Sequence, residues 1–225
     1  MNAKPNARAE RAKALCEALP RVYPDARTEL NFSNPLELLV ATILSAQCTD
    51  VAVNKATPVL FKKYRAARDY AEATPDELDR LLLGINLHRV KAKNIHAAAG
   101  LLVKNHGGEV PQTMEQLVAL PGVGRKTANV VLGNAFGKNI GVVVDTHVAR
   151  LSGRLGLTRE TDPKKIEPDL MKLVPQDKWT LFSHWLIFHG RRRCKALNPD
   201  CPNCEIKDLC PSYPKFMKLR EKRAK

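Results

Sequence analysis

Helix-start signals recur along almost the whole chain, and they restrict it to a fold dominated by α-helices. Asn34-Pro35 precedes an apolar run, and Asn is a good N-cap while Pro is tolerated at the first helical position. Thr74-Pro75 and Asp162-Pro163 repeat the signal, and Thr113 with Gln116 has the spacing of a capping box. The sequence therefore predicts an all-α protein, with a buried central helix after Asn34-Pro35.

Three segments fall outside this helical pattern. Residues 140–144 are β-branched and bounded by glycine, but no second segment of similar quality could pair with them. We expect an extended buried segment there rather than a strand. Residues 1–14 are basic and rich in alanine, and we expect a frayed, solvated tail. Residues 215–225 are expected to form a mobile tail or a final short helix.

Length and hydropathy set the broad class of the protein. The 225 residues, 44% of them hydrophobic, suffice for one large domain or two small ones, each with its own core. No run approaches the roughly 18 consecutive apolar residues of a membrane span, and no secretory signal opens the chain. We expect no membrane partner and an intracellular location, cytoplasmic and, in a bacterium, associated with the nucleoid.

The charge balance points to a polyanionic partner. Lys and Arg number 37 against 23 Asp and Glu, which gives a net charge of +14. Such a chain is attracted to nucleic acid, because neutralising phosphates releases condensed counterions. Simple solubility is the alternative explanation for this excess of charge.

A glycine turn between two helical patterns is the sharpest local motif. Leu120-Pro121-Gly122-Val123-Gly124-Arg125-Lys126 separates helices expected at about 114–119 and 125–135. Gly122 and Gly124 allow a tight bend, and the free N–H groups that follow at a helix N-terminus favour an anion. We expect the backbone of Gly122, Val123 and Gly124, together with Arg125, to bind a DNA phosphate. An ordinary helix hairpin is the alternative.

The six cysteines are unevenly distributed. Two stand alone, and four crowd near the C-terminus with six, two and five residues between them: Cys194, Cys201, Cys204 and Cys210. A secreted disulfide scaffold would spread its cysteines through a shorter chain, so the cluster indicates a metal site. Spacing alone leaves an iron–sulfur cluster and a zinc ion equally supported.

The glycine turn, the segment Val143-Val144-Asp145-Thr146-His147-Val148 and the cysteine cluster together resemble the endonuclease III family of helix–hairpin–helix, iron–sulfur DNA glycosylases. The resemblance extends from about residue 34 to residue 210. It implies a two-lobed all-α fold. One lobe is a six-helix barrel over residues 28–139, with the helix–hairpin–helix at about 113–135. The other lobe combines residues 1–27 and 140–225 and holds the cluster.

The resemblance also implies catalytic residues. Lys126 takes the position of the lysine that attacks the sugar C1′ of a damaged nucleotide, and Asp145 that of the aspartate that stabilises positive charge on the sugar. An amine forms a Schiff base only when neutral, and we expect partial desolvation, the helix N-terminus and Arg125 to disfavour the cation of Lys126. Asp145 could equally be a helix cap. His147 would contact the lesion or a phosphate, or be structural.

Two further positions match residues that fill the space left by an extruded nucleotide. Gln47 would hydrogen-bond the widowed base, and Leu87 would wedge into the base stack. The chain departs from the family beside Leu87, where Asn86 replaces a common Gly and His88 replaces a common Tyr. Asn tolerates a left-handed backbone, whereas His88 puts the contacts next to the extruded base in doubt.

For the cysteines, the resemblance implies a structural 4Fe-4S cluster with all four as ligands. Lys195 would be exposed on the loop that the cluster fixes. Arg191 and Arg193, just before it, would add a second phosphate-binding surface.

The implied function is a bifunctional DNA glycosylase and abasic-site lyase of base excision repair. Its partner would be double-stranded DNA with oxidised pyrimidines or abasic sites, bound by a monomer. The related adenine glycosylases carry an acid in the first barrel helix and usually lack the hairpin lysine, whereas residues 38–47 here contain no acid. A non-catalytic DNA-damage sensor and a zinc-binding transcription factor are the alternatives from other classes.

Overall fold

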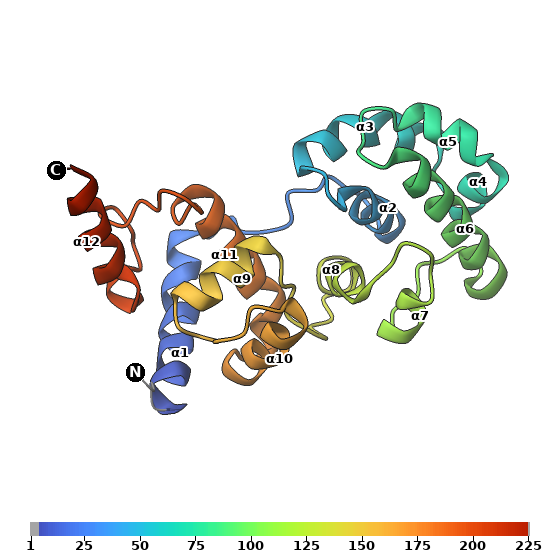
Figure 1. The fold of residues 1–225 in the computed structure, drawn as a ribbon. Helices are drawn as coiled ribbons and strands as arrows, with labels where there is room; N and C mark the ends of the chain where they lie inside the picture. The colour runs from blue at the N-terminus through green and yellow to red at the C-terminus, as the bar shows by residue number, and fades with distance from the viewer. Residues whose placement is uncertain (1–4, 225) are drawn as a thin grey trace. The chain divides into compact units, whose positions relative to one another are not determined.

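The computed structural model describes residues 5–224, and this part of the chain contains helices but no strand. The chain divides into two compact units (Figure 1). We call Thr28–Lys138 the central unit, and Met1–Arg27 with Asn139–Lys225 the terminal unit. The prediction of an all-α protein is confirmed. None of the helices within the described range has the length and apolar character needed to cross a membrane.

The central unit, which lies entirely within the described residues, is a bundle of seven helices. Six have six or more residues, and α7 has five: α2 (Pro35–Ser45), α3 (Asp50–Lys63), α4 (Ala67–Glu72), α5 (Pro75–Leu81), α6 (His88–His106), α7 (Met114–Val118) and α8 (Arg125–Phe136). In Figure 1, α6 runs alongside α4 and α5, and α2 contacts α8. Their apolar faces enclose a single core.

Local capping explains where these helices begin. Asn34 Oδ1 accepts from Glu37 N at 2.9 Å, and the run from Leu38 to Leu44 is buried, so the predicted central helix is confirmed as α2. Thr74 and Thr113 cap α5 and α7 in the same way. Each cap satisfies an N–H that lacks a partner within its helix.

The terminal unit is built from both ends of the chain. Its elements are α1 (Pro5–Val22), α9 (Thr146–Arg154), α10 (Pro163–Leu173), the 3₁₀ turn η1 (Gln176–Lys178), α11 (Trp179–Arg192), the 3₁₀ turn η2 (Lys207–Leu209) and α12 (Tyr213–Ala224). Helix α11 supplies much of the core, with Phe182 and Leu186 fully buried. The C-terminal segment forms a final helix, the second of the two expected outcomes.

The expectation of a frayed N-terminal tail is wrong. Pro5–Val22 is a continuous helix, and Ala12, Leu15 and Leu19 are fully buried in the core of the terminal unit. Arg11 Nη1 also donates to Leu155 O at 3.2 Å. These apolar residues recur at helical spacing, and the charged residues between them obscured the pattern. Residues 1–4 lie outside the described range.

The extended buried segment expected over residues 140–144 is confirmed for residues 142–144, whereas Ile140 is 40% exposed. Val142, Val143 and Val144 are buried and have no regular secondary structure. Val143 N donates to Ser183 Oγ at 3.0 Å, which replaces the hydrogen bond that a neighbouring strand would supply. This anchoring fixes the backbone that leads directly into Asp145.

Candidate active site

The glycine turn joins α7 to α8 as predicted. Gly122 has a left-handed backbone with φ 78°, and a Cβ added there would lie 3.0 Å from Asn94 Cβ and Nδ2. Gly124 is the N-cap of α8 and makes no side-chain cap. No N-cap side chain therefore accepts from the first N–H groups of α8. A helix N-terminus of this kind binds anions well.

Gly122→Ala is expected to destabilise the protein by about 1–3 kcal/mol, because Ala pays for the left-handed backbone and its methyl group meets Asn94. Gly100→Ala in α6 is the matched control. A Cβ at Gly100 meets nothing within 4 Å, so that change should stabilise α6 by about 0.5–1 kcal/mol. Urea unfolding of the two variants measures both effects, and equal stabilities would contradict the prediction.

Lys126 is the second residue of α8, and its side chain is exposed. The expectation that this lysine is partly desolvated is therefore wrong for the protein alone. The helix N-terminus and the neighbouring Arg125 are present as expected. Exclusion of water from the amine would have to come from a bound ligand, because the turn places Lys126 on the surface.

The two predicted wedge residues share an unusual backbone. Gln47 (φ 54°) and Leu87 (φ 58°) are the two non-glycine residues with left-handed φ in the described chain. Gln47 follows α2, and Leu87 precedes α6. Leu87 is 50% exposed, although it is apolar. Strained, exposed residues of this kind occur at functional sites more than elsewhere.

The structure corrects the account of the loop beside Leu87. The left-handed residue is Leu87 itself and not Asn86. His88 turns towards α5, where its Nδ1 pairs with Asp79 Oδ1. A groove of about 470 Å³ runs along residues 83–90. His88 thus borders this groove with its ring held by Asp79.

Asp145 caps α9 in the terminal unit. Its Oδ1 accepts from Val148 N at 2.8 Å, so the capping role is confirmed, and its side chain stays partly exposed. His147 Nδ1 lies 3.2 Å from Arg150 Nη2, which also donates to Gly190 O at 3.0 Å. His147 therefore has a structural partner.

His184 of α11 should make the stability of the terminal unit pH-dependent. Burial lowers its pKa from 6.5 to about 4, although the charge of Asp145 opposes the shift. Between these values the unfolded chain binds more protons, so stability is full above pH 6.5 and falls towards pH 4, by on the order of 3 kcal/mol from this group.

His184→Gln removes this titration, so urea unfolding at several pH values should show a shallower loss of stability in acid. His189, whose pKa burial also lowers to about 4, remains and keeps part of the slope. An unchanged slope in the variant would contradict the assignment to His184.

One pocket of the terminal unit is lined by all four clustered cysteines together with Arg154 and His189. Arg154 Nη1 lies 3.2 Å from Cys194 Sγ, and His189 Nε2 lies 3.6 Å from Cys204 Sγ. Burial raises the pKa of the Cys204 thiol to about 11. Burial also raises the pKa values of Cys201 and Cys210.

The chemistry of this pocket fits a thiophilic metal centre, because four sulfur donors are soft ligands. Yet no three His, Cys, Asp or Glu side chains within residues 5–224 are already arranged as a metal-binding group. Binding would require the thiols to lose their protons. The fold thus brings the four clustered cysteines together in one pocket.

Known protein families and relatives match most of this chain. The family described as "HhH-GPD superfamily base excision DNA repair protein" matches residues 40–176. The chain belongs to this superfamily. Endonuclease III of Synechocystis sp. is 53% identical over 203 residues, covering 90% of this chain and 93% of the relative. Endonuclease III of Bacillus subtilis is 48% identical, covering 84% and 86%.

Solved structures agree with these relatives. A non-covalent endonuclease III–DNA complex has a TM-score of 0.87 and 44% identity, covering 93% of this chain and 98% of that one. A trapped covalent endonuclease III–DNA intermediate matches equally well. This HhH-GPD protein is therefore a DNA glycosylase with abasic-site lyase activity in base excision repair, as the sequence motifs implied.

The basic residues before the cysteine cluster have different surroundings. Arg193 pairs with Asp200 Oδ2 at 2.8 Å and Glu205 Oε1 at 2.6 Å, and these carboxylates raise its pKa. The phosphate contact expected of Arg193 stays a prediction, and in the protein alone its donors serve two carboxylates. Arg191 and Lys195 are exposed in this HhH-GPD protein, and their DNA contacts stay a prediction.

Sequence reasoning missed several residues that organise the site. Lys91 is buried in α6 and donates to the end of α2. Its helical spacing to Ile95, Ala98 and Leu102, all buried, could have revealed it. Arg150 and Arg154 hold the cysteine loop through main-chain oxygens of residues 190 and 194–196, and no sequence pattern indicated that role.

Proposed function

We propose that this HhH-GPD protein removes oxidised pyrimidines from double-stranded DNA and then cuts the strand, with Lys126 as the nucleophile and Asp145 stabilising positive charge on the sugar. One observation carries the proposal: Lys126 lies exposed in the first turn of α8, directly after the Gly122–Gly124 turn. That placement puts an amine beside a backbone anion site.

The chemistry follows from that amine. Neutral Lys126 Nζ attacks the sugar C1′, the bond from C1′ to the base breaks, and the base leaves with a proton. The Asp145 carboxylate would stabilise positive charge on the sugar as the base departs. The remaining amine proton passes to the ring oxygen O4′ as the C1′–O4′ bond breaks, which opens the sugar ring and gives an imine. The imine acidifies the C2′ proton, whose removal expels the 3′ phosphate by β-elimination.

Other predicted residues would bind and distort the duplex. We propose that the backbone at Gly122, Val123 and Gly124 and the Arg125 side chain bind a phosphate near the lesion. Gln47 and Leu87 would fill the gap left by the extruded nucleotide, with His88 beside it. His147, Arg191 and Lys195 would add contacts from the terminal unit.

We also propose that the unit boundaries reflect two roles, with DNA distortion in the central unit and a 4Fe-4S cluster in the terminal unit. Cys194, Cys201, Cys204 and Cys210 would hold the cluster, which would cross-link the loop between them. The protein would act as a monomer where its DNA is, in the cytoplasm or at a bacterial nucleoid. Broad visible absorbance with bound iron supports the cluster, and a colourless zinc protein contradicts it.

Release of thymine glycol from a duplex oligonucleotide tests the substrate. The purified protein should release the base and leave a borohydride-reducible adduct. Cleavage of abasic DNA without release of thymine glycol would reject oxidised pyrimidines as substrates, while leaving the lyase intact. Absence of any reducible adduct would reject the lysine mechanism.

A further inference from the structure

Lys91 is a buried cation that the proposed chemistry does not use. It lies in the first turn of α6 and is only 4% exposed. Its Nζ donates to Leu44 O at 2.8 Å and Ala46 O at 2.6 Å, and lies 3.3 Å from Cys48 Sγ. Three donors and three partners satisfy the ammonium group completely.

These contacts place the charge at the C-terminus of α2. The last carbonyls of a helix lack partners within it and carry the negative end of the helix dipole. Lys91 therefore stabilises the carbonyls on both sides of Ser45 and draws the end of α2 onto α6. Gln47 is the next residue along the chain after Ala46, so its turn starts from a fixed point.

Cys48 extends this link to the second loop. Its Sγ accepts from Asn86 N at 3.3 Å as well as from Lys91 Nζ at 3.3 Å. Asn86 directly precedes Leu87, and Leu87 O accepts from Lys91 N at 3.1 Å. One sulfur atom and one ammonium group thus connect the backbone next to Gln47 with the backbone next to Leu87.

The same two residues are the strained ones. A left-handed backbone at a non-glycine residue persists only where its surroundings enforce it. We propose that Lys91 and Cys48 are positioning residues, which hold Gln47 and Leu87 in the conformation that replaces an extruded nucleotide. This inference rests on the function proposed above. Burial keeps Lys91 away from DNA, so it acts through its neighbours.

The test compares substrates that do and do not need a wedge. A single-stranded abasic oligonucleotide has no base stack to fill, whereas a thymine glycol in a duplex requires extrusion. For Lys91→Met we expect duplex thymine glycol release to fall by about 10- to 100-fold, and single-strand abasic cleavage to change by less than about threefold. Brightening of 2-aminopurine opposite the lesion, which reports unstacking, should fall in parallel.

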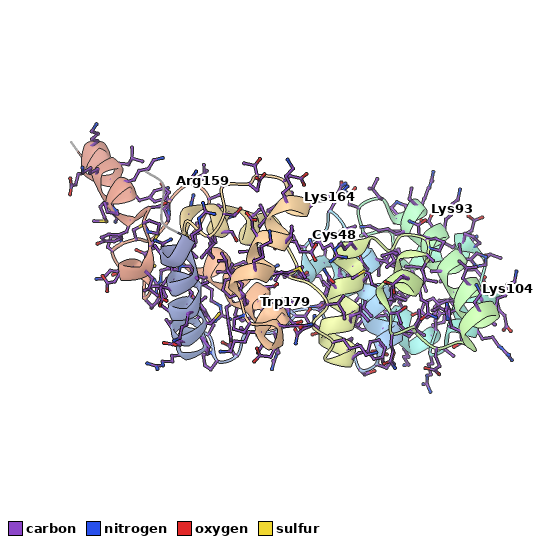
Figure 2. All side chains as sticks on the ribbon, turned by 90° about the horizontal axis from the view of Figure 1, so that it is seen from below. Cys48, Lys93, Lys104, Arg159, Lys164 and Trp179 are labelled. Carbon is purple, nitrogen blue, oxygen red and sulfur yellow. The ribbon has the colours of Figure 1, made fainter. Side chains whose placement is uncertain are left out.

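Matched variants separate this role from general damage to the fold. Lys104→Met makes the same change at an exposed position in the last turn of α6, and should behave as wild type. Lys104 and Cys48, the positions of the control variant and of the alternative variant, are labelled in Figure 2. If Lys91→Met does not fold, Cys48→Ala serves instead. It should lower duplex activity several-fold, while Cys48→Ser keeps an acceptor and should restore most of it.

A final comparison asks whether Lys91 acts through the wedge residues. In a Gln47→Ala, Leu87→Ala background, adding Lys91→Met should reduce duplex activity by less than about threefold further, because the residues it positions are gone. A multiplicative loss in that background, or equal losses on single and double strands, would overturn the inference. Wild-type protein that forms no adduct even on single-stranded abasic DNA would instead reject the proposed function.

Discussion

Lys126→Gln is expected to abolish the borohydride-dependent cross-link to abasic DNA and to slow strand cleavage at least about 1,000-fold. Gln has nearly the length of Lys and remains polar, but its amide nitrogen cannot form an imine. The turn before α8 contains no atom of this side chain, so the anion site at the helix N-terminus persists. DNA affinity should therefore fall by less than about tenfold, the effect of one lost charge.

Lys138→Gln is the matched control, because Lys138 is exposed just beyond the other end of α8. It makes the same change in charge and should retain cross-linking and cleavage. Gel separation of reduced adducts and a binding titration with abasic duplex measure the two activities independently. A cross-link that survives in Lys126→Gln would show that another amine is the nucleophile.

Cys204→Ser should prevent binding of the proposed 4Fe-4S cluster and destabilise the terminal unit by more than about 4 kcal/mol, the scale on which loss of a structural metal acts. Without a cation, burial holds the Cys204 thiol protonated, with its pKa raised to about 11. The positive charge of a bound metal would offset the negative charge of the buried thiolates in this pocket. A serine hydroxyl replaces that ligand poorly, so iron content and visible absorbance should fall with stability.

Cys16→Ala provides the comparison within the same unit. Cys16 is buried in α1 but does not line the cysteine pocket. Its loss should cost packing energy while leaving the iron content of the purified protein unchanged. Iron analysis, absorbance spectra and urea unfolding of both variants test the assignment. Full iron occupancy in Cys204→Ser would remove this residue from the ligand set.

Much of the proposed catalytic hairpin could be predicted because its determinants are local. Thr113 caps α7 through a bond to a residue three positions away, and Gly122 supplies a φ that other residues adopt at a cost. Such features depend on a few neighbouring dihedral angles. The sequence therefore located Lys126 in the first turn of α8, as the structure confirms.

The exposure and the partners of individual side chains were harder to predict from the sequence. The exposure of Lys126 differs from the expected partial desolvation, and the carboxylate partners of Arg193, Asp200 and Glu205, were not foreseen. From residue 5 on, the predicted N-terminal tail is part of α1, whose Ala12 packs with Leu15 and Leu19 in the core of the terminal unit. The burial and the partners of each of these side chains depend on which other segments the folded chain packs beside it.

The sequence by itself determined the starts of α2, α5, α7 and α10 with their caps, the glycine turn and the grouping of four cysteines, because short-range hydrogen bonds and backbone sterics specify them. The tertiary structure alone decided that Lys91 reaches the end of α2, 47 residues away from Leu44, and that Arg154 reaches Cys194, 40 residues away. A long side chain has many possible partners in an extended chain. Packing of its helix selects one set, and that selection sets the backbone around Gln47 and Leu87.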